Sequence, residues 1–378
     1  MVKKNLVFEE IDSTSEVNRK PMIMDDPYGS SIATKQSILW LSILLVMIIC
    51  MVAVGGMTRL TDSGLSIVEW KPITGILFPL TNEQWIIEFE KYKLIPEFSL
   101  VNSDMTMPEF KNIFFWEWGH RQLGRAIGLV WIIGFSWLAI KRQIPAGWPR
   151  KFLLLGFLIG LQGAIGWWMV YSGLMPEMTD VASYRLATHL GMAFCIVGLI
   201  LWFILSLRLT VESAMVSRRS RDKKLYFYMK VYLFALFLQI LLGALVAGID
   251  AGTAYTDWPL MAGDFFPSEY WAFEGVFYNL LESPAAVQFN HRMSAYFLLI
   301  VWVLNLAYSR KNPINFLKYS HALLFVTLFL QIVLGIVTVT YGAPYQIAIV
   351  HQLLALVLWL LAVWVFFETA YPRRQILT

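Results

Sequence analysis

The chain has 378 residues, of which 58% are hydrophobic, 15% aromatic and only 15% charged. A mean hydropathy of +0.59 excludes an ordinary soluble domain, because so apolar a surface must be covered by lipid. The net charge is only +4, and the two cysteines, Cys50 and Cys195, lie in apolar runs, which excludes a disulfide framework and a cysteine-rich metal site. We therefore predict an all-α integral membrane protein with no nucleic-acid partner.

Residues 1–37 form a polar segment with acidic residues such as Glu9, Glu10 and Asp12. A mitochondrial transit peptide avoids acidic residues, and a secretory signal has an early apolar segment, so this stretch matches neither. We interpret it as the cytoplasmic tail of a bacterial protein. The expected location is therefore the bacterial inner membrane.

Eight apolar runs are long enough to cross a bilayer, since about 20 residues at about 1.5 Å rise per residue span about 30 Å of hydrocarbon. The expected spans are residues 38–56, 120–140, 152–171, 187–207, 231–249, 290–308, 321–340 and 347–367. The pattern predicts eight transmembrane helices.

Basic residues outnumber acidic residues only in alternate connections between these runs, and the first connection is net acidic. The second, fourth and sixth connections carry Lys and Arg, with Arg218, Arg219 and Arg221 in the fourth. The fifth connection, residues 250–288, holds six acidic residues and no Lys or Arg. Because Lys and Arg are retained on the cytoplasmic side of a membrane, we expect the basic connections and both termini to be cytoplasmic.

The second half of the chain repeats the first. The matched residues are His120 with His291, Arg121 with Arg292, and His189 with His351. An even number of spans in each copy gives both copies the same orientation, so we predict two tandem four-helix bundles related by a pseudo-twofold axis along the membrane normal. The predicted divisions are a tail (1–37), an N-terminal unit (38–207), a basic linker (208–230), a C-terminal unit (231–367) and a second tail (368–378).

Four of the five histidines are predicted at one depth, within the first turn or two of helices that run inward from the outer surface. They are His120, His189, His291 and His351. Two histidines on two helices of one bundle are suited to bind the iron of a flat macrocycle through two axial imidazoles. Zinc is a weaker alternative, because two histidines leave a tetrahedral site short of ligands. A simple interfacial hydrogen-bonding role is the other alternative.

Three arginines accompany the first histidine of each pair. Arg121 and Arg292 directly follow it, and Arg125 lies one turn deeper in the first unit only. We predict that they contact anionic groups such as macrocycle propionates, with anchoring at the membrane interface as the alternative.

Three glutamines and one further histidine are predicted to be structural. Gln162, Gln239 and Gln331 each lie in a mid-helix LQ…G pattern, which favours packing and hydrogen bonding between helices. His321 has no repeat partner and is expected at the cytoplasmic end of its helix. Whether the glutamines also act at a bound group stays open.

Glu117 is the acidic residue that only one unit carries, because the matching residue is Gln288. It lies three residues before His120, so on a helix it projects from nearly the same face. The alternative to a catalytic role is a local ion pair with Arg121. The second unit keeps its arginine without an acid, and this favours the catalytic role.

Three stretches resemble the haem A synthase family: GGMTRLTDSGLS (55–66), EWGHRQLGR (117–125) and AGTAYTDWPLM (251–261). With the four histidines at repeat spacing, the resemblance covers residues 38–367. This family consists of membrane oxidoreductases that oxidise a ring methyl of haem O to the formyl group of haem A.

The resemblance implies a role for each histidine pair. His291 and His351 would be the axial ligands of a haem b cofactor, and His120 and His189 would flank the iron of the substrate haem. Glu117 matches the acidic residue of the family's motif, and we predict that it is catalytic. The N-terminal unit would then change its haem, while the C-terminal unit keeps its own.

The implied substrate is haem O, the implied partners are haem O synthase and an electron donor, and the implied purpose is terminal oxidase assembly. The source of the oxygen, the identity of the donor and a homo-oligomer stay open. A quinol-linked carrier with two b-type haems explains the histidines equally well. It does not explain why only the first unit carries an acid, Glu117, at this position. A transporter is a further alternative, although transport sites cluster near the bilayer midplane.

Overall fold

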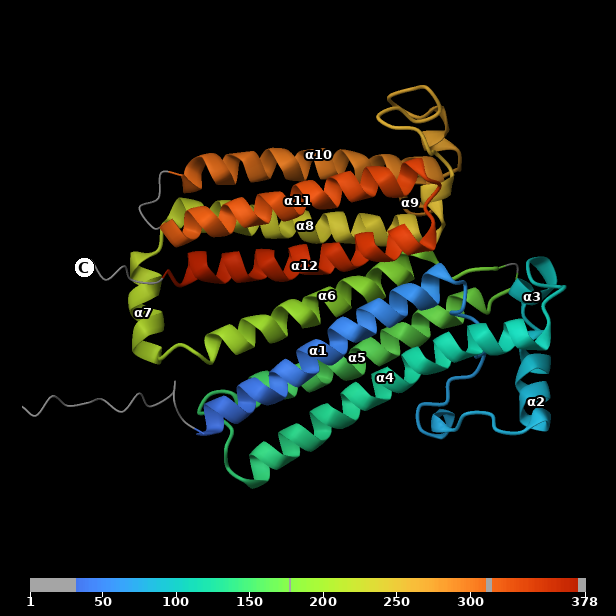
Figure 1. Cartoon of the computed structure of the whole chain (residues 1–378), viewed down its shortest axis with the longest axis horizontal. Helices are drawn as coiled ribbons and strands as arrows, with labels where there is room; N and C mark the ends of the chain where they lie inside the picture. The colour runs from blue at the N-terminus through green and yellow to red at the C-terminus, as the bar shows by residue number, and fades with distance from the viewer. Residues whose placement is uncertain (1–31, 177, 311–314, 373–378) are drawn as a thin grey trace, which may run out of the picture.

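The computed structural model describes residues 32–176, 178–310 and 315–372, which contain α-helices, short 3-10 turns and no strand (Figure 1). The helices are α1 (Ile32–Leu60), α2 (Asn82–Tyr92), α3 (Pro96–Leu100), α4 (Met107–Ile140), α5 (Pro149–Gly173), α6 (Ser183–Ser206), α7 (Val211–Ser220), α8 (Lys223–Gly248), α9 (Val276–Glu282), α10 (Pro284–Ser309), α11 (Asn315–Thr340) and α12 (Tyr345–Ala370). The 3-10 turns are η1 (Thr74–Ile76), η2 (Ala251–Thr253) and η3 (Ser268–Trp271).

Eight of the described helices are long and apolar enough to cross a membrane, namely α1, α4, α5, α6, α8, α10, α11 and α12. The predicted all-α membrane fold with eight spans is therefore confirmed. Most of these helices extend beyond the predicted apolar runs. Helix α4 shows why: Thr106 and Glu109 form a capping box that starts the helix at Met107, well before its apolar stretch.

The predicted N-terminal tail and the predicted basic linker both contain helix. Helix α1 begins at Ile32, inside the expected tail, and the rest of that tail lies outside the described residues. The expected basic linker 208–230 contains all of α7 and the start of α8, where Asp222 caps the helix through the backbone N–H groups of Lys224 and Leu225. Helix propensity and capping, rather than hydropathy, set these boundaries.

The spanning helices form two groups that lie side by side in Figure 1. Helices α1, α4, α5 and α6, here called the N-terminal unit, pack as α1 on α4, α4 on α5, α5 on α6 and α6 on α1. Helices α8, α10, α11 and α12, the C-terminal unit, pack in the same cyclic order. The units meet through α6 with α8, α6 with α12 and α1 with α12.

Helix α1 is shared between the two units. A Cβ on Gly56 would lie 2.6 Å from Nε2 of Gln352, so α12 approaches α1 where α1 has no side chain. Gln352 donates a hydrogen bond to the carbonyl of Val52 at 2.9 Å. The neighbouring Gly55 packs against His120 of the N-terminal unit. Two successive glycines of α1 thus contact different units.

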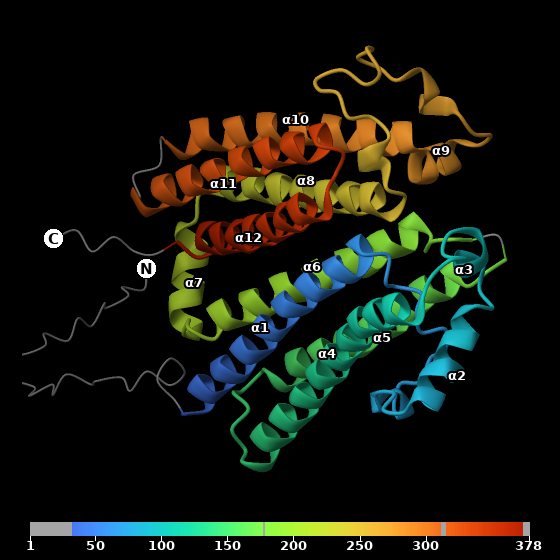
Figure 2. The same ribbon diagram turned by 45° about the vertical axis from the view of Figure 1, so that its right-hand side comes forward.

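The long loops gather at one end of the bundle, together with α2, α3 and α9, and we call this the loop end (Figure 2). Helix α7 lies at the opposite end. The segment 61–106 has a core of its own with α4, in which Trp85, Phe89 and Tyr92 pack on Phe110. The N-terminal unit is therefore covered at the loop end by an ordered cap rather than by a plain connection.

Candidate functional site: two histidine pairs

The structure brings the four predicted histidines into two pairs. His120 on α4 lies within electrostatic reach of His189 on α6, and His291 on α10 lies within reach of His351 on α12. Three of the four lie near the start of their helices, as expected. His120 does not, because its helix begins at Met107. Each unit therefore holds one pair, drawn from its second and fourth spanning helices.

Each imidazole packs against a glycine on the spanning helix that precedes its own. An added Cβ would lie 3.1 Å from His120 at Gly55, 2.8 Å from His189 at Gly166, 2.9 Å from His291 at Gly243 and 2.9 Å from His351 at Gly335. Real Cβ atoms essentially never come closer than 3.0 Å, and contacts just above that are tight. The glycines therefore provide the room that the rings occupy.

Three of the rings also lie beside a glutamine amide. Gln162 donates to the backbone carbonyl of His189 at 2.9 Å, and its Nε2 lies 3.2 Å from Nδ1 of that ring. Gln239 donates to the carbonyl of His291 at 3.1 Å, and its Nε2 lies 3.1 Å from Nδ1 of that ring. Gln331 donates to the carbonyl of His351 at 3.0 Å, and its Nε2 lies 3.2 Å from Nδ1 of that ring. The predicted bonding between helices is confirmed. That its partner is a histidine was missed, although both the LQ…G pattern and the histidines recur in the sequence.

These surroundings fit an iron-binding imidazole. The glutamine amides hold three of the histidines in position by donating to their backbone carbonyls from the preceding spanning helix. The Oε1 atoms of Gln162, Gln239 and Gln331 are buried without a hydrogen-bond partner among the described residues. Buried polar atoms without a partner beside the histidines fit a site that is completed by a bound group.

Glu117 and Arg121 hold the loop that follows α1. The Glu117 carboxylate accepts hydrogen bonds from Ser66 Oγ and from the Ile67 backbone N–H, both at 2.7 Å, and its other oxygen pairs with Arg121 at 2.6 Å. Arg121 also donates to the carbonyls of Ile67 at 2.7 Å and Glu69 at 2.9 Å. The ion pair weighed as an alternative therefore exists, but it is buried: the Glu117 side chain is 3% exposed.

Gln288 and Arg292 hold the corresponding loop of the C-terminal unit. Gln288 donates to the carbonyl of Tyr255 at 3.0 Å, and Arg292 donates to the carbonyls of Tyr255 at 3.0 Å and Leu260 at 2.9 Å. A carboxylate only accepts hydrogen bonds, whereas an amide also donates. The same two helix positions thus fasten a loop in both units with opposite hydrogen-bond polarity.

Arg125 holds a later part of the same loop, and one of its donors has no partner among the described residues. Its Nε donates to the carbonyl of Pro72 at 2.9 Å and its Nη2 to that of Lys71 at 2.7 Å, while Gln122 donates to Gly75 at 3.0 Å. Nη1 of Arg125 is buried and has no partner among the described residues. Of the three predicted arginines, Arg125 has the donor that best suits an anionic group.

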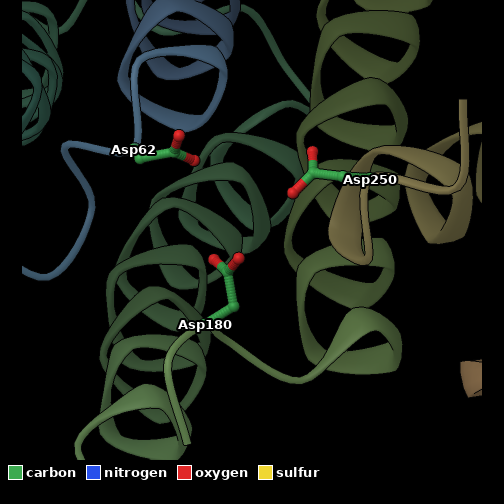
Figure 3. A group of neighbouring side chains, drawn as sticks. All are labelled: Asp62, Asp180 and Asp250. Atoms are coloured by element: carbon green, nitrogen blue, oxygen red, sulfur yellow. The ribbon is translucent and has the colours of Figure 1, made fainter. Parts of the chain in front are cut away.

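Arg59 joins the units at the loop end through three carboxylates. Figure 3 shows Asp62, Asp180 and Asp250, which come from three segments of the chain. The guanidinium of Arg59 lies 2.8 Å from Asp62, 2.8 Å from Asp250 and 3.4 Å from Asp180. Burial raises the pKa of Asp180 to about 6 even though Arg59 opposes the shift. The carboxylates thus surround an arginine of the chain itself, an arrangement that the sequence did not predict.

His321 stands apart from the two pairs. Its ring is fully buried in α11, and its Nδ1 lies 2.7 Å from the carbonyl of Leu317 in the same helix. This contact agrees with the predicted structural role. Cys50 and Cys195 are both free.

Eight spanning helices with two histidine pairs define a multi-span membrane protein with two histidine-lined sites. The family model described as a cytochrome oxidase assembly protein matches residues 38–363. A relative from Roseobacter denitrificans is 48% identical over 98% of both chains, and one from Dinoroseobacter shibae is 49% identical over 98% of this chain and 97% of its own. A relative from Paracoccus denitrificans is 46% identical over 97% and 96%. All three are named heme A synthase.

The chain belongs to the haem A synthase family, as the matches extend over nearly its whole length.

Proposed function

We propose that this protein is a membrane oxidoreductase that oxidises the ring methyl of haem O to the formyl group of haem A, for assembly of terminal oxidase. The observation that carries the proposal is the near full-length similarity to relatives named heme A synthase. The two histidine pairs support it, because a synthase needs one site for a haem that is changed and another for a haem that is kept. Haem O synthase and an electron donor are the partners that we expect.

In this proposal His291 and His351 are the axial ligands of haem b, and His120 and His189 bind the iron of the substrate haem. Bound haem b would supply one-electron transfer. Both C-terminal rings have a glycine beside them, and a glutamine amide holds the backbone carbonyl of each histidine, which suits ligands that keep a cofactor in place. Nη1 of Arg125 would bind a propionate of the substrate haem, since it is the buried donor left without a partner.

Glu117 is the proposed catalytic residue. Its carboxylate would stabilise positive charge that develops at the reacting carbon and accept a proton released there. The bonds from Ser66, Ile67 and Arg121 fix the carboxylate in place, so little reorganisation is needed when charge develops. The same bonds make Glu117 part of the cap, so its loss would affect both chemistry and loop position.

We further propose that the loop end faces the outside of a bacterial inner membrane and that both termini are cytoplasmic. The basic connections, including that with Arg218 and Arg219 on α7, lie at the opposite end. A reporter fused after Thr378 should be cytoplasmic and one inserted near Ser103 should be outside. A cytoplasmic signal at Ser103 would contradict this orientation.

The unit boundaries 38–207 and 231–367 and a pseudo-twofold axis along the membrane normal complete the proposed architecture. The equal cyclic packing order of the two units supports this arrangement. The same axis would relate the His120 and His291 sites, which agrees with their matching glycine contacts.

Analysis of the bound pigments tests the function. The protein is purified from a membrane that contains haem O, and the extracted haems are separated by chromatography. We expect haem b together with haem O or haem A. Haem b alone would favour a quinol-linked electron carrier, and the absence of haem would favour a transporter; either result would contradict the proposal.

A further inference from the structure

One of the four histidines lacks the amide neighbour that the others share. In α5, α8 and α11 a glutamine stands four residues before the glycine that contacts the ring, as Gln162 does before Gly166. In α1 the residue four before Gly55 is Met51. A thioether donates no hydrogen bond, so Met51 does not replace the amide.

The geometry places Met51 where a glutamine would act. Its Cε lies 3.3 Å from the position of a Cβ on Gly124, one turn beyond His120 on α4. Met51 therefore faces α4 beside His120, as the glutamines face the helices that carry their histidines. Within residues 32–176, 178–310 and 315–372 no side chain forms a hydrogen bond with the ring or the carbonyl of His120, whereas a glutamine amide donates to the carbonyl of each of the other three histidines.

A ligand histidine donates its second ring N–H, so an amide N–H does not orient the ring itself. The glutamine amide instead holds the backbone of its histidine, by donating to the carbonyl of His189 at 2.9 Å, of His291 at 3.1 Å and of His351 at 3.0 Å. The exception therefore falls in the unit where, on the proposed function, a haem must enter and leave. A cofactor site gains from two fixed ligands, but a substrate site must also release its product.

We propose that Met51 makes His120 the weakly held, exchangeable ligand of the substrate haem, and that the absence of a glutamine at this position permits product release. This inference rests on the proposed function. Met51 acts through His120 and is therefore a positioning residue. Gln162, Gln239 and Gln331 have the opposite effect, because they hold their histidines in place.

The test restores the missing amide with Met51→Gln. The purified protein is mixed with excess apomyoglobin, and the transfer of each haem is followed over time, with haem b distinguished from haem O and haem A by chromatography. One hydrogen bond is worth about 1 kcal/mol, so we expect release of haem O and haem A to slow about fivefold. Release of haem b should not change.

Two matched variants complete the experiment. Gln162→Met should speed the release of haem O and haem A about fivefold, and Gln331→Met should speed that of haem b by a similar factor. These variants keep the inference testable if Met51→Gln fails to fold. An unchanged release rate in folded Met51→Gln, or in Gln162→Met, would overturn the inference. Faster release from Met51→Gln would also overturn it, because the sulfur would then hold the haem.

The outcome is separable from that of the proposed function. If the wild-type protein carries neither haem O nor haem A, the proposed function fails before any rate is measured. If it carries them and the variants release them at the wild-type rate, only the inference about Met51 fails.

Discussion

The two units fasten their loops from the same helix positions but with opposite chemistry. Glu117 accepts hydrogen bonds from Ser66 and Ile67, whereas Gln288 donates one to the carbonyl of Tyr255. The arginine that follows each histidine does the same work in both, by donating to loop carbonyls. The duplicated helix therefore accepts an acid or an amide, provided that its loop presents the matching groups.

The glycine contacts show the opposite behaviour, because they are present in both units at all four rings. Every site must accommodate imidazole rings, and a glycine on the preceding spanning helix provides the space in each case. Two other positions differ between the units: Glu117 stands where the C-terminal unit has Gln288, and Met51 stands where it has Gln239. The glycines thus accommodate a histidine ring in either unit, whereas Glu117 and Met51 distinguish the N-terminal site from the C-terminal one.

Replacing an axial histidine should have the largest effect, and the effect should differ between the two units. His351→Ala should lose essentially all stable haem b, because one axial imidazole alone does not retain the low-spin complex. His189→Ala should keep haem b and lose turnover. Absorption spectra and extracted pigments measure both effects. A normal low-spin spectrum in His351→Ala would contradict the assignment of the pairs.

Glu117→Gln should lower the conversion of haem O to haem A by about 100-fold or more, the lower end of what a positioned acid or base contributes. The amide removes the charge and puts a donor where Ser66 and Ile67 already donate. Haem b content should stay at the wild-type level. Chromatography of extracted pigments should show haem O accumulating.

Ser66→Ala is the matched control for Glu117→Gln. It removes one hydrogen bond to the carboxylate but keeps the negative charge. A loss of about five- to tenfold would separate loop position from charge. Equal losses in the two variants would assign Glu117 to holding the cap rather than to chemistry.

Gly335→Ala should lower haem b occupancy severalfold, because its Cβ would stand 2.9 Å from the ring of His351. Gly166→Ala makes the same change beside His189 and should leave haem b in place. The ratio of haem b to protein, measured from the pyridine haemochrome spectrum, tests both. Equal loss of haem b in the two variants would show that the units do not act as separate sites.

The smallest expected effect concerns Glu97, a buried acid in the cap of the N-terminal unit. Burial raises its pKa from 4.5 to about 8, and the charges of Asp180, Glu117 and Asp62 add to the shift. The folded state then binds the proton more tightly than the unfolded state, so stability should be greatest below about pH 4.5 and fall as the pH rises through 8. Other groups superimpose their own dependence on this one.

Glu97→Gln should remove that contribution. Thermal unfolding of the purified protein across this pH range should therefore show a shallower decline in the variant than in the wild type. A parallel decline in both proteins would show that Glu97 does not take up a proton on folding.

Hydropathy and repetition predicted much of this molecule. The eight spans, the duplicated order and the four histidines follow from apolar run length and from matched motifs in the sequence. Helix ends did not follow, since the capping box at Thr106 and Glu109 extends α4 through residues that are not apolar.

Contacts between segments far apart in the sequence could not be predicted either. The sequence presents Glu117 and Arg121 as a local pair, and only the fold adds Ser66 and Ile67 to it. Arg59 likewise meets Asp180 and Asp250 only because the ends of three segments converge. Residue spacing defines partners along one helix, but it carries no information on what a separate loop brings to that helix.

The adjacent glycines of α1 have a consequence for the independence of the two units. Gly55 accommodates His120 of one unit and Gly56 accommodates Gln352 of the other, so a single helix packs against both. The C-terminal unit without α1 would lose the acceptor of Gln352, the carbonyl of Val52, and would expose the face of α12 that now packs on Gly56. One helix of the N-terminal unit is thus part of the packing of the other.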